Sequence, residues 1–123
     1  MPGKIEDVIV VEKREGVDIV YFLIPRLTDP MIANDIKSYL SSIIPEGKDH
    51  LVFNFTSVQY LSSAYLGILI ALDKSVRPRG GKINICCLAP DIAKVFSIAG
   101  FDAIFDILPT EGAAIVKMRE HIK

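Results

Sequence analysis

Apolar residues follow two different rhythms along this chain. Nearly continuous apolar runs of strand length predict β-strands at residues 7–14, 17–24, 51–55, 82–88 and 103–108. Between them, apolar residues recur at the spacing of one helix face, at residues 30–43, 63–76, 90–99 and 111–121. The order is β-β-α-β-α-β-α-β-α. This alternation favours a mixed, mostly parallel sheet with helices packed on it, and we predict a single α/β domain over residues 1–123.

Turn and cap residues stand at the predicted boundaries. Glu15-Gly16 lies between two apolar runs and predicts a tight turn, so the first two strands should form an antiparallel hairpin. Thr28 or Asp29 is expected to cap the first helix, because Pro30 suits the first helical position. The segment Pro45-Glu46-Gly47 is expected to end that helix.

Composition excludes several classes of protein. Half of the 123 residues are hydrophobic, which is enough for a substantial core in one compact domain. The net charge is -1, so the basic surface typical of nucleic-acid binding is not expected. No apolar run reaches the roughly 18 residues of a membrane span, and the first residues are acidic where a signal peptide would be basic and then apolar. We therefore expect a cytoplasmic protein.

Motifs of catalysis and cofactor binding are missing from the sequence. It contains no GxGxxG, GxxxxGK[ST] or GxSxG pattern. Cys86 and Cys87 are adjacent, and neighbours on a strand point to opposite faces, so we interpret them as small apolar side chains rather than a disulfide or metal site. His50 and His121 are far in sequence from any candidate nucleophile. We predict no catalytic residue, no metal and no cofactor.

Ser62 and Ser63 stand at a junction between the predicted strand 51–55 and the apolar helix 63–76. Serine is a favoured N-cap because its hydroxyl accepts a hydrogen bond from a free N–H group of the first turn. The positive end of a helix dipole also favours a phosphate group. The residues alone thus leave two interpretations of Ser63, a plain cap or a site of phosphorylation.

Helical spacing separates two faces of this second helix. One stripe is assigned to the core and comprises Tyr65, Ile68, Leu69, Leu72 and Val76. The opposite side carries Ser63, Leu66, Gly67, Ile70 and Lys74. Apolar groups on a partly exposed face with a polar rim are typical of partner sites. Leu66 and Ile70 therefore either form a docking surface beside the serine or are covered by neighbouring loops.

The stretch from Asn54 to Gly67, NFTSVQYLSSAYLG, resembles the regulatory motif of the STAS domain. That motif is roughly Asp-x-Ser-x-Val-x-[Phe/Tyr]-Met-Asp-Ser-[Ser/Thr]-Gly-Leu-Gly. Gly80-Gly81 and the segments 89–101 and 104–107 also resemble the family. This chain departs from the family where acidic, hydroxyl or glycine residues are replaced, at Thr28, Asn54, Ser62, Ala64 and Tyr65.

The resemblance implies a regulatory binding protein and not an enzyme. STAS proteins of this kind are bacterial anti-sigma factor antagonists, which bind an anti-sigma factor that is also a serine kinase. The resemblance implies phosphorylation at Ser63, a PP2C-type phosphatase as a further partner, and partner contacts at Thr28, Ser62, Ala64, Tyr65, Leu66, Gly67 and Ile70. Two alternatives stay open: a STAS scaffold that is not phosphorylated, and a small-ligand-binding α/β protein with a deep polar pocket.

Overall fold

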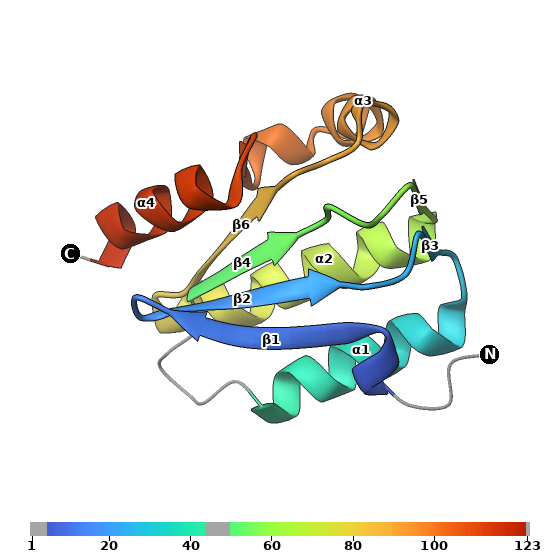
Figure 1. The fold of residues 1–123 in the computed structure, drawn as a ribbon, viewed down its shortest axis with the longest axis horizontal. Coiled ribbons are helices and arrows are strands. Elements are labelled where there is room, and N and C mark those ends of the chain that lie inside the picture. Colours follow the sequence, from blue (N-terminus) through green and yellow to red (C-terminus); the bar gives the residue numbers. More distant parts are fainter. Residues whose placement is uncertain (1–4, 44–49, 123) are drawn as a thin grey trace.

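A five-stranded sheet runs through the centre of the molecule, with helices on both of its faces (Figure 1). The structure, a computed structural model, describes residues 5–43 and 50–122. The strands lie in the order β1 (Ile9–Arg14), β2 (Val17–Phe22), β4 (His50–Asn54), β6 (Lys82–Cys86) and β7 (Asp106–Leu108). β1 and β2 pair antiparallel and the other neighbours pair parallel. This mixed, mostly parallel sheet confirms the predicted fold class.

Four α-helices complete the fold. On one face of the sheet lie α1 (Pro30–Ile43) and α2 (Ser63–Val76), and on the other lies α4 (Glu111–Ile122), as Figure 1 shows. The helix α3 (Pro90–Ile98) lies beyond the carboxyl end of β6. None of the helices in the described part of the chain is long and apolar enough to cross a membrane.

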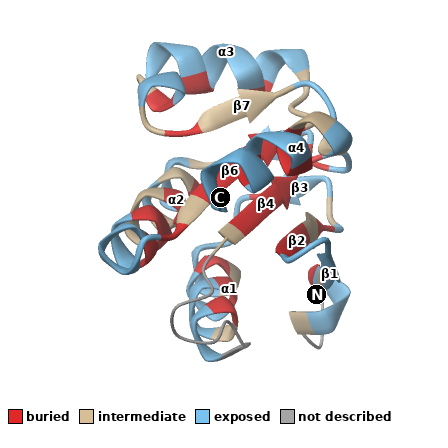
Figure 2. Ribbon diagram, turned by 90° about the vertical axis from the view of Figure 1, so that its left-hand side faces the viewer, coloured by how far each residue is buried: buried red, intermediate tan, exposed pale blue. Residues whose placement is uncertain are grey.

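The sheet builds two apolar cores because successive side chains of a strand point to opposite faces. Ile19 and Val52 belong to the smaller core, under α4. Val20 and Phe53 belong to the larger one, under α1 and α2. Figure 2 shows the buried positions concentrated on the strands and on the helix faces turned toward them. The large core includes edge-to-face aromatic pairs that Phe22 forms with Phe53, at 5.5 Å between ring centroids, and with Phe55, at 4.8 Å.

The predicted hairpin turn is confirmed. Arg14 pairs with Val17, which leaves Glu15 and Gly16 as a two-residue loop. Both loop residues have positive φ, 53° at Glu15 and 81° at Gly16. This is the turn type whose twist matches that of the flanking strands, and glycine takes up its conformation without steric strain.

Several predicted boundaries differ from the structure. The strand expected at 103–108 is wrong over its first half, because Phe101–Ala103 forms a 3₁₀ turn and only Asp106–Leu108 forms β7. The residue before that turn, Gly100, has a φ of 79°, and Phe101 and Phe105 point into the core instead of continuing a ladder. The strands expected to reach residues 24 and 88 end at Phe22 and Cys86, and residues 5–7 form a 3₁₀ turn before β1.

The two cysteines do not point to opposite faces as expected. Cys86 ends β6, and Cys87 leaves the strand with a φ of 64°. Both side chains therefore pack in or against the core under α4. They are free thiols, one buried and one half-buried.

A second, two-stranded sheet was not predicted. It pairs β3 (Arg26–Leu27) with β5 (Tyr60–Leu61) in parallel, beyond the ends of β2 and β4 (Figure 1). Strands of two residues are too short to leave a periodic pattern in the sequence. This small sheet brings the segment after β2 against the segment that leads into α2.

The start of α1 is capped as predicted. The Asp29 carboxylate accepts a hydrogen bond from the backbone N–H of Met31 at 2.9 Å, so Asp29 and not Thr28 supplies the cap. The stop expected at Pro45-Glu46-Gly47 lies outside the described residues.

Candidate functional site

Ser63 is exposed and is the first residue of α2. That helix begins at the end of the sheet where β2 and β4 finish (Figure 1). Ser62 takes the N-cap position, with φ −83° and ψ 166°. Its carbonyl oxygen accepts the N–H groups of Tyr65 at 3.1 Å and Leu66 at 3.3 Å. The helix therefore begins at the residue that the sequence predicted.

The Ser62 hydroxyl does not cap the helix, which corrects the expected role of this side chain. Its oxygen is buried and has no hydrogen-bond partner within the described residues. The backbone holds Ser62 instead, because its N–H donates to the Leu27 carbonyl at 2.9 Å. The hydroxyls thus have different surroundings: that of Ser62 is turned inward, and Ser63 is open to solvent.

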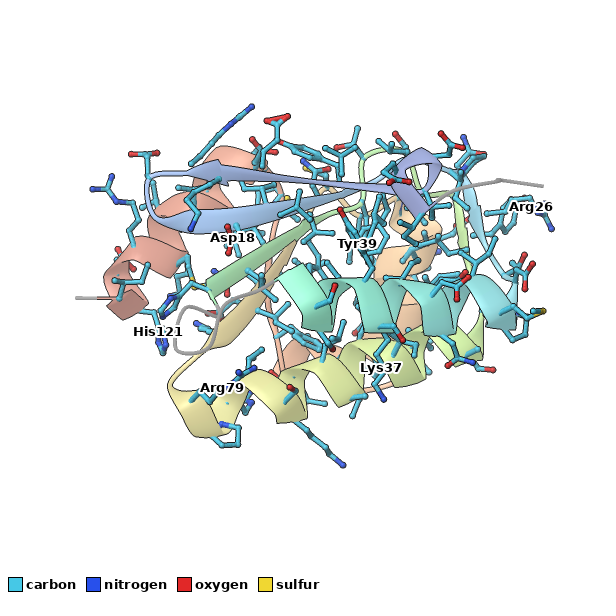
Figure 3. The ribbon with its side chains drawn as sticks, turned by 90° about the horizontal axis from the view of Figure 1, so that it is seen from below. Asp18, Arg26, Lys37, Tyr39, Arg79 and His121 are labelled. Atoms are coloured by element: carbon cyan, nitrogen blue, oxygen red, sulfur yellow. The ribbon has the colours of Figure 1, made fainter. Side chains whose placement is uncertain are left out.

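Backbone hydrogen bonds join the segment after β2 to the segment before α2. The Pro25 carbonyl accepts the N–H groups of Gln59 at 2.7 Å and Tyr60 at 3.0 Å. Between the paired strands β3 and β5, the Arg26 guanidinium stacks over the Tyr60 ring, 4.6 Å from its centroid. Figure 3 shows Arg26 at this exposed edge of the molecule. The two segments consequently form one platform, on which Thr28 is exposed.

The buried side chain of Tyr65 connects α2 to the segment after β2. Its side chain is 3% exposed, and its hydroxyl donates a hydrogen bond to the Asp29 carbonyl at 2.9 Å. Burial, and then the negative charges of Asp29 and Asp35, raise the pKa of Tyr65 to about 12. Tyr65 was expected among the residues that touch a partner. Its burial excludes direct contact, in agreement with its place in the predicted core stripe.

The other predicted contact residues divide by exposure. Ala64 and Gly67 are exposed, whereas Leu66 and Ile70 are half-buried and pack against the edge of the large core. Of the predicted core stripe, Leu69, Leu72 and Val76 are buried, and Ile68 is only half-buried. The outer surface of α2 near Ser63 is thus made of small residues with apolar side chains at its margin.

Three exposed apolar side chains that the sequence did not single out belong to the connections at this end of the sheet. They are Leu23 after β2, Met31 in the first turn of α1, and Tyr60 in β5, with exposed fractions of 43%, 76% and 55%. No periodic signal could have found them, because each lies in a connection or at the start of an element. They add exposed apolar surface to the segments that follow β2 and precede α2.

Asn54 ends β4 behind this surface and is buried. Its side-chain N–H donates to the Glu111 carboxylate at 2.9 Å, and its oxygen accepts the backbone N–H of Thr56 at 2.9 Å. Glu111 also accepts a hydrogen bond from Arg14 at 2.8 Å. The amide therefore connects the start of the 56–59 loop to α4 and β1. The sequence did not reveal Glu111 as a partner.

An open groove lies beside this end of the sheet, between β5 and α3. It has a volume of about 310 Å³ and is lined by Gln59, Tyr60, Ala89, Pro90 and Asp91. A drug-sized ligand is usually enclosed by a deeper pocket with several converging polar groups. The groove fits contact with a protein surface better than enclosure of a small molecule.

The histidines lie at the other end of the sheet. The His50 and His121 rings are 5.7 Å apart, and the His121 ring is 3.1 Å from the Gly80 carbonyl oxygen. Figure 3 shows His121 and Arg26 at opposite ends of the molecule. Ser63 therefore has no histidine beside it that could act as a general base.

These features define a small α/β domain with an exposed serine at the start of α2. The chain belongs to the STAS domain family, whose model matches residues 9–114.

Relatives and solved structures agree with this assignment. BtrV of Bordetella bronchiseptica, provisionally named an anti-sigma factor antagonist, is 29% identical over 82 residues, which cover 67% of this chain and 71% of that protein. An anti-sigma factor antagonist from Mycobacterium paratuberculosis has the same fold, with a TM-score of 0.79 and 22% identity over 91% of this chain and 93% of that one. The phosphorylated form of the Bacillus cell fate determinant SpoIIAA superposes with a TM-score of 0.69 and 20% identity, over 89% and 98% of the two chains.

Proposed function

We propose that this protein is an anti-sigma factor antagonist. It would bind an anti-sigma factor through the face formed by Thr28, Ser63, Ala64 and Gly67, with Leu66 and Ile70 at the margin. Capture of the anti-sigma factor would release a sigma factor for transcription in the cytoplasm. Family membership and the name of the BtrV relative support this proposal.

Phosphorylation of Ser63 is the proposed off switch, and the exposure of Ser63 at the start of α2 is the observation that carries it. A phosphate adds about −1.5 to −2 charges at neutral pH. The first N–H groups of a helix lack intrahelical acceptors and favour an anion, so the domain can accept the group without refolding. The same charge would disrupt an apolar interface that has to exclude water.

The kinase would be the anti-sigma factor itself, and its ATP and Mg²⁺ would belong to that partner. A PP2C-type phosphatase would reverse the modification. The antagonist then contributes a substrate hydroxyl and a docking surface and performs no chemistry of its own. A loss of 1.4 kcal/mol of binding free energy weakens an interaction tenfold, so even a modest penalty from the phosphate would serve as a switch.

A second candidate function is a STAS scaffold that binds its partner without phosphorylation. One observation favours it: the neutral Asn54 is buried in hydrogen bonds to Glu111 and Thr56. No carboxylate is therefore supplied to the docking face from positions 54 and 62, where the STAS motif has aspartates.

The test combines a kinase reaction with a binding measurement. The purified protein is incubated with Mg-ATP and an anti-sigma factor kinase of the same organism, and modified peptides are mapped. We expect phosphate on Ser63, none on Ser63→Ala, and loss of binding by Ser63→Glu. Ser75→Glu is the matched control, because it adds the same charge to an exposed serine at the far end of α2.

The outcomes separate the two candidates. Binding without phosphate transfer supports the scaffold and rejects the switch. Absence of binding to every anti-sigma factor of the organism rejects both.

A further inference from the structure

The hydroxyl of Tyr65 links the N-termini of α1 and α2. Tyr65 is in the first turn of α2, and the acceptor of its hydrogen bond is the backbone carbonyl of Asp29, at 2.9 Å. That carbonyl also accepts the first helical hydrogen bond of α1, from Ala33 at 3.1 Å. A single oxygen atom thus receives one donor from each helix.

Asp29 is the residue that sets the start of α1, because its carboxylate caps the N–H of Met31 at 2.9 Å. Two residues before it, the Leu27 carbonyl accepts the N–H of Ser62 at 2.9 Å. Thr28 lies between these two anchored residues and is exposed. Its backbone is therefore held on one side by the backbone of the α2 segment and on the other by the Tyr65 side chain.

The backbone holds this segment to the α2 side through the β3–β5 pairing and through the N–H groups of Gln59, Tyr60 and Ser62. Any sequence with this fold could form them. The bond from Tyr65 requires a tyrosine hydroxyl, and the STAS motif has a glycine at that position. The bond is thus a feature of this particular chain, and its donor stays protonated because burial raises the pKa of Tyr65 to about 12.

We propose that Tyr65 is a positioning residue that preorganises the docking face by holding residues 28–30 in their binding conformation before a partner arrives. A preorganised loop lowers the ordering cost of association. The role in docking rests on the proposed function, whereas the restraint on the loop is a property of the free protein.

Hydrogen exchange of backbone amides in the full chain tests the restraint directly. Tyr65→Phe keeps the buried ring and removes only the hydroxyl. We expect the amides of Met31 and Ala33 to exchange about fivefold faster, the factor that corresponds to ~1 kcal/mol, the net value of one hydrogen bond. The amide of Gly81, bonded to Val76 at the far end of α2, should not change.

Tyr60→Phe is the matched control, because Tyr60 is 55% exposed on the same platform. Unchanged exchange at Met31 and Ala33 in Tyr65→Phe, or an equal change in Tyr60→Phe, would overturn the inference. A uniform acceleration that includes Gly81 would also overturn it, since that pattern reports global destabilisation.

Binding kinetics separate this inference from the proposed function. With the anti-sigma factor that the wild type binds, Tyr65→Phe should associate more slowly, in proportion to the fall in the fraction of molecules whose residues 28–30 are held and by at most about fivefold, and should dissociate at an unchanged rate. Faster dissociation with unchanged association would contradict preorganisation. If the wild type binds no anti-sigma factor, the proposed function fails, while the exchange experiment still decides on the restraint.

Discussion

The side-chain amide of Asn54 donates a hydrogen bond to the carboxylate of Glu111 across 2.9 Å. This contact connects the last residue of β4 to the first residue of α4. An amide can make it and a carboxylate cannot, because Glu111 offers only acceptors to residue 54 when it is ionised. Position 54 is acidic in the STAS motif, but in this chain its surroundings favour a neutral side chain.

Asn54→Asp should destabilise the protein. The change replaces a hydrogen bond by contact between a buried carboxylate at position 54 and the half-buried carboxylate of Glu111, and we expect the free energy of unfolding at neutral pH to fall by about 2–3 kcal/mol. Like charges raise the pKa of the pair in the folded state. The loss should therefore be full at neutral pH and should shrink as the pH falls and one carboxyl takes up a proton.

Urea unfolding across this pH range measures the effect. Asn54→Ala is the control, because it removes the same hydrogen bonds without adding a charge. Its loss in free energy of unfolding should therefore depend much less on pH. Equal pH profiles for the two variants would show that repulsion from Glu111 is not the cause.

Alkaline titration should show that Tyr21 and Tyr65 ionise at higher pH than an ordinary tyrosine. Burial and the neighbouring Glu111 raise the pKa of Tyr21 to about 12, and burial raises that of Tyr65 to about 12. The pKa of each of these tyrosines is higher in the folded protein than in the unfolded chain. Each therefore contributes its full stabilisation of the fold below the ordinary tyrosine pKa of about 10, and this contribution is lost as the pH rises through the folded pKa of about 12.

Ultraviolet absorbance of phenolate measures this titration. Tyr65→Phe should remove one late step, and its stability should decline less than that of the wild type between pH 10 and 12. If Tyr21 and Tyr65 ionise near the ordinary tyrosine pKa while the wild type is still folded, the burial of these hydroxyls is refuted.

The two thiols should react at different rates in the native protein. Cys86 is fully buried and burial raises its pKa, whereas Cys87 is half-buried just after β6. Because the thiolate is the reactive form, a thiol reagent should label Cys87 first and Cys86 only after unfolding. Mass spectrometry of labelled peptides distinguishes the sites, and Cys87→Ser should abolish the fast phase. A fast phase that persists in Cys87→Ser would contradict this order.

Ile70→Asp should leave the protein folded but prevent docking. Ile70 is half-buried at the edge of the core, so a carboxylate there can still reach water, and we expect a loss of about 1–2 kcal/mol in stability. Leu69→Asp is the paired control: its side chain is 3% exposed, and the change should unfold the domain. Circular dichroism reports folding, and binding to the anti-sigma factor reports docking. Unfolding of Ile70→Asp would assign the residue to the core.

Local sequence patterns predicted most of the elements because their signals are contained in single segments. The stretch from Ser62 to Val76 combines a serine pair with helical apolar spacing, and α2 spans Ser63–Val76. Glu15-Gly16 predicted its turn from the conformational freedom of one glycine. The failures are equally local: β3 and β5 are too short to show a period, and Gly100 diverts residues 101–105 from the predicted strand into the core.

The sequence by itself determined where Ser63 lies, at the junction between a buried strand and an apolar helix, because capping and periodicity act between near neighbours. Only the tertiary structure decided what surrounds it. The bond of Tyr65 to Asp29 spans 36 residues, and that of Asn54 to Glu111 spans 57. Such partners are brought together by sheet order and helix packing, which depend on the whole chain at once. For the same reason, the hydroxyl of the expected cap Ser62 is turned inward, and Tyr65 lies buried beneath the proposed docking face instead of forming part of it.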